Sequence, residues 1–252
     1  MSPSRFHEVF RRSTGETVKQ YTLRLRLERA AFRLLTERTS VAAIAFDLGF
    51  GSHESFTRAF RRSHHRSPSD FRRQIRPPSL ARDPGTTVLT PSFTSVSTTS
   101  AVLLQPAHVA FVRRIGPYEL VDPDEYATLL AWVGRRGLDA IGLIGIAHDA
   151  PGITPGTRLR FDVGVHVTSP FQSTREVSYQ LLSERWSAAT SYVGPFSGLA
   201  AAYERAFRAA SELRGFDVLG LPVEERYLTT ALLTHQTIQT TQILIPLRRT
   251  VA

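Results

Sequence analysis

The spacing of apolar residues between Ser40 and Arg73 predicts two short helices joined by a tight turn, followed by a third helix start. Four apolar residues at the i, i+3, i+4, i+7 spacing of one helix face mark the first helix: Val41, Ile44, Ala45 and Leu48. Gly49 stands where this helix must stop, because glycine takes the left-handed conformation at little cost. Ser52 can cap the second helix, and Ser67-Pro68 can begin the third. The pattern is that of a helix-turn-helix.

The second helix of this predicted helix-turn-helix buries one side and leaves a polar, basic side to solvent. Its apolar side consists of Phe56, Ala59 and Phe60. A helix of this size and polarity can enter the major groove of DNA. We therefore expect DNA contacts from its polar side and its cap: Ser52, His53, Glu54, Thr57, Arg58, Arg61 and Arg62. The alternative is an ordinary helical hairpin with a solvated basic face.

Two further helices are predicted ahead of this motif, over residues 1–12 and 18–36. The first begins with a capping Ser2 followed by Pro3. Its polar side adds three candidates for DNA contact: Arg5, Glu8 and Arg11. The second carries apolar stripes on opposite sides, which predicts packing on both. Its arginines are then expected to face solvent or phosphate: Arg24, Arg26, Arg29 and Arg33.

Residues 101–252 contain an internal repeat of a strand, a Gly-Pro-aromatic turn, an amphipathic helix and a glycine. The two turns are Gly116-Pro117-Tyr118 and Gly194-Pro195-Phe196. The helix residues expected to point inward are Tyr126, Leu129, Leu130 and Val133 in the first copy, and Leu199, Tyr203, Phe207 and Ala210 in the second. Further strands are predicted at 159–167, 177–182, 227–232 and 242–247.

These patterns predict a multidomain protein. Residues 1–76 form an all-α helix-turn-helix DNA-binding domain, and residues 101–252 form an α+β domain. Duplicated strand-helix-strand units imply an antiparallel sheet with two helices on one face. Residues 77–100 are rich in Pro, Ser and Thr and lack periodicity, which is typical of a linker whose last residues begin a strand.

Charge is concentrated in the first third of the chain. The net charge is +9, and residues 1–76 hold 16 Arg and Lys against 7 Asp and Glu, whereas residues 77–252 hold 15 of each. An excess confined to one domain favours a polyanionic partner, such as double-stranded DNA. Cysteine is absent and no apolar run reaches the length of a membrane span, so we expect a cytoplasmic protein without disulfides or membrane contact.

A specific set of residues runs through the predicted helix-turn-helix: Ile44-Ala45, Gly49-Phe50, Ser52, Phe56, Arg58-Ala59-Phe60, Ser67-Pro68 and Phe71-Arg72. This set resembles the signature of the AraC family of transcription regulators. The family usually has an aromatic residue and a glycine after the recognition helix, where this chain has His64 and His65, so we expect a less well formed turn. Two family helices that precede residues 1–12 are missing from the sequence, so we expect the first of two helix-turn-helix units to be incomplete.

A second set of residues covers the α+β domain: the two Gly-Pro-aromatic turns, residues 145–151 (GIAHDAP), 160–165 (RFDVGV), 225–228 (ERYL) and 245–247 (IPL). It resembles the GyrI-like effector-binding domain, which also ends some MerR-type regulators. The resemblance implies a cleft between the two repeats that binds hydrophobic, often cationic, small molecules. Candidate wall residues are Phe111, Tyr118, Phe161, Trp186, Tyr192, Phe196 and Tyr227.

Glu225 is the sharpest candidate for a polar contact with the ligand. It stands in an E-x-Y position that resembles the family's ligand-facing acid. A carboxylate in an apolar cleft is costly unless it meets a cation or a hydrogen-bond donor. The alternative for Glu225 is a surface glutamate paired with Arg226, and the alternative for each aromatic candidate is an ordinary core residue.

No catalytic residue, metal or cofactor is expected. No Ser-His-Asp order or phosphate loop stands out, and His148-Asp149 and His64-His65 lack further ligands at metal-binding spacing. The predicted function is an AraC-type transcription regulator with DNA, a small-molecule effector and RNA polymerase as partners. One alternative is a small-molecule binding or sequestering protein whose truncated DNA-binding half is not competent. Another is hydrolysis of a reactive ligand, which a few GyrI-like proteins are thought to perform.

Overall fold

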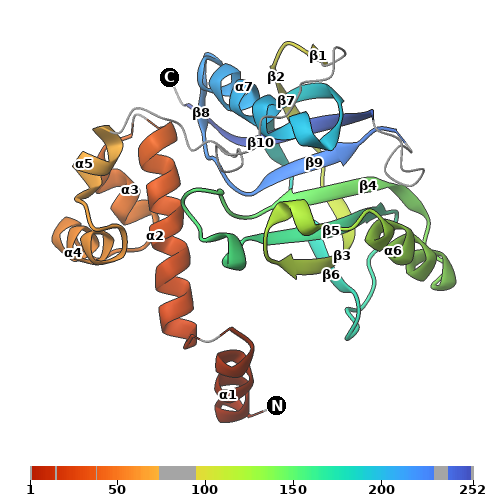
Figure 1. Ribbon diagram of the computed structural model, residues 1–252, viewed down its shortest axis with the longest axis horizontal. Coiled ribbons are helices and arrows are strands. Elements are labelled where there is room, and N and C mark those ends of the chain that lie inside the picture. Colours follow the sequence, from red (N-terminus) through yellow and green to blue (C-terminus); the bar gives the residue numbers. More distant parts are fainter. Residues whose placement is uncertain (1, 15, 38, 74–94, 230–237, 251–252) are drawn as a thin grey trace. The chain divides into compact units, whose positions relative to one another are not determined.

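The computed structural model describes residues 2–14, 16–37, 39–73, 95–229 and 238–250 (Figure 1). Contacts between residues divide the chain into two units, residues 1–76 and 77–252, and each unit is described by itself. Most of the expected linker, residues 77–94, lies outside the described residues. In the described part of the chain, no helix combines the length and the hydropathy that a membrane crossing requires.

The first unit consists of helices. They are α1 (Pro3–Thr14), α2 (Val18–Thr36), α3 (Val41–Asp47), α4 (His53–His64) and α5 (Pro68–Arg73). The expected caps form, because the side chains of Ser40 and Ser52 accept hydrogen bonds from the backbone N–H groups of Ala43 and Ser55. Gly49 ends α3 with φ +78°. The sequence pattern therefore predicted the helix-turn-helix closely.

The core of the helical unit lies where α2, α3 and α4 meet. Its buried members are Leu27, Ala30, Ala31, Phe32, Leu34, Ile44, Ala45, Phe56 and Phe60. Burying one such phenylalanine stabilises the fold by roughly 1.5–3 kcal/mol. The expectation that α2 packs on opposite sides is right only for its second half. Leu23, in the first half, is 37% exposed.

Two of the arginines expected at the surface of α2 belong to ion pairs. Arg33 is only 5% exposed, and its guanidinium lies 2.7 Å from Glu37 and 3.0 Å from Asp47. Arg24 is half-buried and pairs with Glu16 and Glu28. The expectation that Arg24 and Arg33 face solvent or phosphate is therefore wrong. Acidic partners one turn away, on α3 and just before α2 satisfy these charges locally.

The turn after α4 forms without the glycine that the family pattern supplies. His65 takes φ +56°, in the left-handed region, and the ring of His64 lies 4.4 Å from the ring of Phe60. His64 thus fills the aromatic position of the family pattern. The expected defect is a conformational cost at His65 rather than a loss of the turn, because a side chain in the left-handed region costs about 1–2 kcal/mol.

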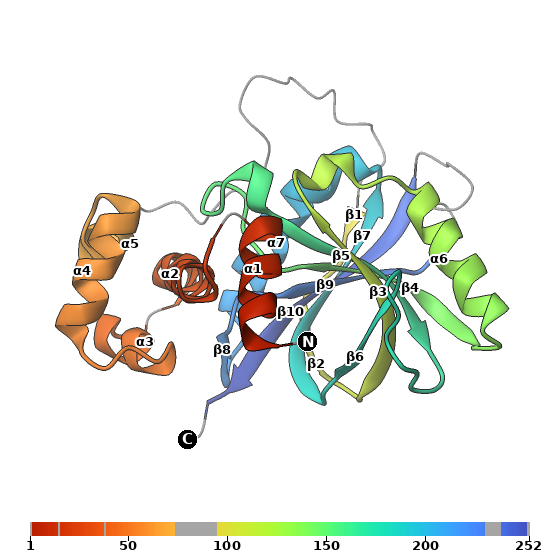
Figure 2. The ribbon, with the colours of Figure 1, turned by 90° about the horizontal axis from the view of Figure 1, so that it is seen from below.

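The second unit is built on one curved sheet of ten strands (Figures 1 and 2). The strands are β1 (Ser95–Val96), β2 (Ser100–Leu104), β3 (Ala107–Ile115), β4 (Ala140–Ala147), β5 (Arg160–Val167), β6 (Ser178–Leu182), β7 (Arg185–Gly194), β8 (Phe216–Val218), β9 (Val223–Tyr227) and β10 (Gln239–Arg249). The helices are η1 (Tyr118–Leu120), α6 (Asp124–Arg135), η2 (Gly156–Arg158), η3 (Phe196–Gly198) and α7 (Leu199–Ser211).

The order of the strands reflects the internal repeat. The path is β1-β7-β10-β9-β4-β5-β3-β6, with β2 paired to β7 and β8 paired to β10. Its centre reads β3-β5-β4 from the first copy and β9-β10-β7 from the second, so the two copies meet where β4 pairs with β9. At that junction Gly145 stands directly opposite Glu225. A pseudo-twofold axis therefore passes between these two residues.

Both long helices cover the same face of the sheet. Tyr126, Leu129 and Val133 of α6 pack on buried residues of β5, and α7 contacts β7, β8 and β10. Hydroxyl groups of Tyr126 and Tyr203, one from each helix, reach side chains of β9 on that face. The expected architecture, an antiparallel sheet with two helices on one face, is confirmed.

The strand predicted at 227–232 is wrong in position. β9 covers Val223–Tyr227, Leu228 and Thr229 follow the strand, and residues 230–232 lie outside the described residues. The strand is defined by its pairing with β4 and β10 on either side. Those partners are far away in the sequence, so a local pattern that includes two adjacent glutamates does not indicate this strand.

Substitutions at His65 and Gly49, which both have φ in the left-handed region, are expected to change the stability of the helical unit in opposite directions. Replacing His65 by glycine removes a steric cost, so His65→Gly is expected to stabilise the unit by about 0.5–1 kcal/mol. Gly49→Ala is expected to destabilise it by about 1 kcal/mol, since φ is +78° although the added Cβ meets nothing closer than 3.7 Å. Hydrogen exchange of the α2 and α4 amides in the full chain measures both changes. Equal signs for the two variants would contradict this account.

Candidate functional site

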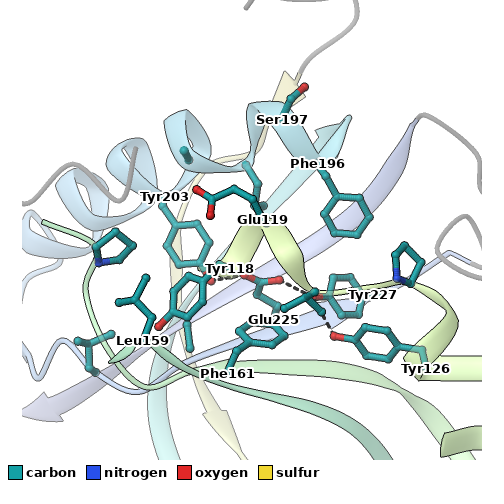
Figure 3. Close-up of a pocket in the computed structure, with 17 residues that line it drawn as sticks. Tyr118, Glu119, Tyr126, Leu159, Phe161, Phe196, Ser197, Tyr203, Glu225 and Tyr227 are labelled. Atoms are coloured by element: carbon teal, nitrogen blue, oxygen red, sulfur yellow. Dashed lines mark hydrogen bonds between the residues drawn. The ribbon is translucent and has the colours of Figure 1, made fainter. Parts of the chain in front are cut away.

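A cavity of about 380 Å³ opens over the centre of the sheet, between α6 and α7 (Figure 3). This volume lies within the ordinary range for small-molecule pockets, roughly 300–1,000 Å³. Six aromatic side chains line it: Tyr118, Tyr126, Phe161, Phe196, Tyr203 and Tyr227. The two short helices η1 and η3, which follow the Gly-Pro turns of the two repeats, contribute Tyr118 and Phe196 from opposite copies.

Glu225 lies at the base of this cavity, on β9. It is 5% exposed, and its two carboxylate oxygens accept hydrogen bonds from the hydroxyls of Tyr203 and Tyr227, both at 2.5 Å. The hydroxyl of Tyr126 donates in turn to that of Tyr227, at 3.3 Å. Figure 3 shows these tyrosines around the carboxylate. A buried acid is thereby held by neutral donors from α7 and β9, and α6 joins the network through Tyr227.

Burial sets the protonation behaviour of this group. Desolvation raises the pKa of Glu225, although the hydrogen bonds from Tyr203 and Tyr227 act in the opposite direction. Desolvation also raises the pKa values of both tyrosines, and the nearby charge of Glu225 adds to the effect. The tyrosines therefore remain protonated donors at neutral pH, and ionisation of the Glu225 carboxyl group carries a cost in free energy.

Arg226 does not pair with Glu225. Its Nε donates to Glu224, at 2.7 Å, on the opposite face of the sheet, where Arg185 also binds Glu224. Neighbouring residues of a strand point to opposite faces, so the acid and the arginine that follow each other in sequence separate. The alternative of a surface Glu225 paired with Arg226 is therefore excluded by the geometry.

Gly145 makes room for the base of the cavity. A Cβ placed on it would collide with the ring of Phe161 and lie 2.7 Å from the hydroxyl of Tyr227. The two aromatic side chains therefore occupy the space that a side chain at position 145 would need. Of the two residues that face each other across the pseudo-twofold axis, one carries the acid and the other must carry no side chain.

The structure brings together five of the predicted ligand residues at this cavity: Tyr118, Phe161, Phe196, Glu225 and Tyr227. Three others lie outside its lining. Phe111 packs beside Val109, Ile144 and Ile146 on the other face of the sheet, and Trp186 contacts Phe216. Tyr192 donates a hydrogen bond to the carbonyl of Pro195 and supports the start of η3. These three residues therefore do not line the cavity. Phe111 lies on the opposite face of the sheet, whereas Trp186 and Tyr192 share the face of Glu225 but pack against Phe216 and the start of η3.

Sequence reasoning missed several lining residues, notably Tyr126, Tyr203 and Glu119. The helix pattern placed the two tyrosines on inward faces and treated them as core. The sequence did indicate that these tyrosines are more than core residues, because a tyrosine on an apolar helix face has a hydroxyl that needs a hydrogen-bond partner. Glu119 follows the Gly-Pro-Tyr turn and is exposed at the rim.

The candidate DNA-contacting residues of α4 are mostly accessible. His53, Glu54, Arg58, Arg61 and Arg62 are exposed. Ser52 uses its hydroxyl as the helix cap, and Thr57 has an enclosed hydroxyl oxygen without a hydrogen-bond partner among the described residues. The polar side of α4 therefore presents basic side chains, with Thr57 the exception to the expected pattern.

The α1 candidates are also exposed. Arg5 and Glu8 lie 3.2 Å apart at the surface, and Arg11 extends from the same helix. Surface pairs of this kind contribute about 0–1 kcal/mol and rearrange readily when another charge approaches. Neither α1 nor any other described part of the chain gathers three or more potential metal ligands.

Comparison with known proteins agrees with the division of the chain. Residues 1–74 match a family model described as a helix-turn-helix domain, and residues 98–248 match the GyrI-like small molecule binding domain. The Msm operon regulatory protein of Streptococcus mutans is 35% identical over 75 residues, or 30% of this chain and 27% of that protein. SoxS of Escherichia coli K12 is 40% identical over 67 residues, or 27% of this chain and 63% of SoxS. Both resemblances inferred from the sequence are confirmed.

The chain spans about a quarter of the first of these relatives and less than two thirds of the second. Among solved structures, the EcmrR C-terminal domain aligns with 60% of this chain and 97% of its own, with 16% identity and a TM-score of 0.48. A hydrolase from Listeria innocua aligns with 60% and 92%, with 12% identity and a TM-score of 0.41.

The raised pKa of Glu225 predicts a specific dependence of stability on pH. Between the ordinary glutamate pKa, about 4.3, and the higher value in the fold, the native state binds more protons than the unfolded state. The free energy of unfolding contributed by Glu225 therefore falls as pH rises through this window. Glu225→Gln is expected to lose this slope, and to be more stable than wild type at neutral pH in the absence of ligand.

Urea denaturation of the full chain, followed by tryptophan fluorescence, measures this slope because both Trp132 and Trp186 lie in the second unit. Glu184→Gln is the control, since Glu184 is exposed and outside the cavity lining. An unchanged pH slope in Glu225→Gln would contradict the assignment of Glu225 as the buried titrating acid.

Proposed function

Because the chain belongs to the family of GyrI-like small-molecule binding domains, we propose that it is an AraC-type transcription regulator that senses a hydrophobic, cationic small molecule. One observation carries the proposal. Glu225 is a buried carboxylate at the base of an aromatic cavity, and its hydrogen-bond partners are neutral tyrosine hydroxyls. The cavity holds an acid that no positive side chain of its described lining meets.

A cationic ligand is the occupant that this arrangement favours. Removing a carboxylate from water costs several kcal/mol unless an opposite charge or enough donors meet it. The aromatic walls add attraction, because a desolvated cation over a ring gains about 2 kcal/mol. The remaining walls are apolar and favour a hydrophobic body on the ligand. The pocket thus suits a lipophilic cation better than a neutral or an anionic molecule.

The helical unit is proposed to bind double-stranded DNA through α4. Its support is the basic excess of residues 1–76, the exposed side chains of α4 and the match to helix-turn-helix regulators. We propose that Arg58, His53 and Glu54 contact base edges and that Arg61 and Arg62 contact phosphates. RNA polymerase is a proposed partner, since relatives of this unit include the transcriptional activator RhaS of Yersinia pestis, 38% identical over 69 residues.

The ligand is proposed to be bound rather than converted, with no cofactor. A regulator responds to a ligand only through different affinities of the ligand for two arrangements of the protein. The buried acid suits this role, because it has a positively charged partner only when the cationic ligand occupies the pocket. The competing function is a sequestering protein that binds the small molecule without sequence-specific DNA binding. A preferred DNA site separates the regulator from the sequestering protein.

Arg58→Ala is expected to reduce affinity for a selected DNA site by about 1–3 kcal/mol while changing affinity for random DNA much less. The reason is that a base contact carries sequence information, whereas a phosphate contact does not. Fluorescence anisotropy on both DNAs at one salt concentration measures the two losses. Arg62→Ala is the matched control and is expected to weaken binding to both DNAs equally. Equal losses for Arg58→Ala would contradict base reading, and absence of any preferred site would favour sequestration.

Glu225→Gln is expected to weaken binding of a phenylbutyl-trimethylammonium ion at least tenfold, because it removes the charge that complements the cation. The neutral tert-butyl analogue of the same shape should bind wild type and variant about equally. Thermal shift and calorimetry on the full chain measure both. If the cation and its neutral analogue bind wild type equally, the proposed cation sensor is wrong.

A further inference from the structure

The rim of the cavity differs between the two repeats. The short helices η1 and η3 stand at equivalent places in the two copies and both contribute to the cavity lining. Glu119 follows the aromatic residue in the first turn, whereas Ser197 follows it in the second. Figure 3 shows the Glu119 carboxylate above the pocket, on the same side of the sheet as Glu225. The cavity therefore carries one acid at its base and another at its mouth.

Glu119 is an acid of the cavity lining that pairs with no side chain in the described part of the chain. Two other acids of this region are paired with arginine: Asp149 with Arg160 at 2.6 Å, and Glu125 with Arg114. In the described part of the chain, no hydrogen bond or ion pair joins Glu119 to another side chain. None of the described lining residues is Lys, Arg or His. Two acids thus face one cavity without a positive side chain between them.

We propose that Glu119 and Glu225 form a two-point cation site, and that the preferred ligand is an elongated amphiphile with two positive centres. This inference rests on the proposed function, because it assumes that the cavity takes a cation at Glu225. One positive group lies at the base against Glu225 and the aromatic rings. The second lies at the mouth against Glu119, and the apolar walls cover the chain that joins them.

The two acids contribute unequally. Glu225 is buried, so its attraction for a cation is little affected by salt. Glu119 is exposed, and exposed pairs are weak, so its contribution to the affinity for a dication is about two- to fivefold at low ionic strength. That contribution falls as salt increases, because mobile ions screen the exposed pair. The rim therefore sets a preference among cations, while the base determines whether a cation binds at all.

A general steering effect makes a different prediction from a two-point site. An acid that only attracts cations to the cavity raises the association rate of monocations and dications alike. A two-point site adds affinity only for a ligand whose second charge reaches the mouth. Spacer length in the ligand then matters, because a chain that is too short cannot place its second charge there.

The experiment compares bis(trimethylammonio)alkanes of increasing chain length with the monoquaternary alkyl-trimethylammonium of the same length. Calorimetry measures their dissociation constants for the full chain and for Glu119→Gln, at low and at physiological salt. Glu184→Gln is the control, because it removes one exposed negative charge of the same domain away from the cavity. We expect Glu119→Gln to weaken the best dication two- to fivefold at low salt, and to leave the monocation within the error of the measurement.

Three results overturn the inference. The first is an equal loss for monocation and dication in Glu119→Gln, which indicates steering. The second is a loss of dication affinity in Glu184→Gln equal to that in Glu119→Gln, which indicates that the net charge of the domain determines the affinity. The third is a wild-type protein that binds the monocation, with dependence on Glu225, but gains nothing from a second charge at any spacer length. In that third case the proposed cation sensor stands and the two-point site fails. Failure of both ligand types to bind is failure of the proposed function itself.

Discussion

A carboxylate buried without a cation is the constraint on which the second unit depends. Glu225 can be held at the base of the cavity only because tyrosine hydroxyls meet both of its oxygens, one from α7 and one from its own strand. That requirement fixes the face of β9 that points inward and the face of α7 that packs on the sheet. It also explains why Tyr126, on the other helix, joins the network through Tyr227. The polar network and the apolar core share the same helix faces.

Local sequence signals predicted much of the helical unit and the plan of the sheet. Capping residues, Gly49 and the apolar periodicity located α2, α3 and α4, and the repeat predicted two helices on one face. Long-range pairing was beyond those signals. Arg33 was assigned to the surface because the acid on α3 that meets it comes 14 residues later, and β9 was misplaced because distant strands define it.

Only part of the candidate site was predicted, again because local sequence signals do not show which distant elements meet. The E-x-Y position indicated Glu225 and Tyr227, and the Gly-Pro turns indicated Tyr118 and Phe196. Periodicity shows which side of a helix faces inward, but it does not show where two helices leave a gap above the sheet. Tyr126 and Tyr203 consequently read as core residues. Phe111 was misassigned because strand alternation distinguishes two faces without saying which of them is hollowed. Trp186 lies on the hollowed face but packs on Phe216 outside the cavity lining, and the sequence does not show how far along a strand the cavity extends.

The glycine opposite Glu225 has a consequence for how a ligand can lie. A duplicated frame presents nearly the same walls to a molecule that enters in either of two directions, related by the pseudo-twofold axis. Phe161 and Tyr227 fill the space above Gly145, so a second acid cannot be accommodated there. The duplicated frame is nearly symmetric, but its buried acid lies on one side of the axis only. A ligand with a single positive end would therefore meet this acid in only one of the two directions.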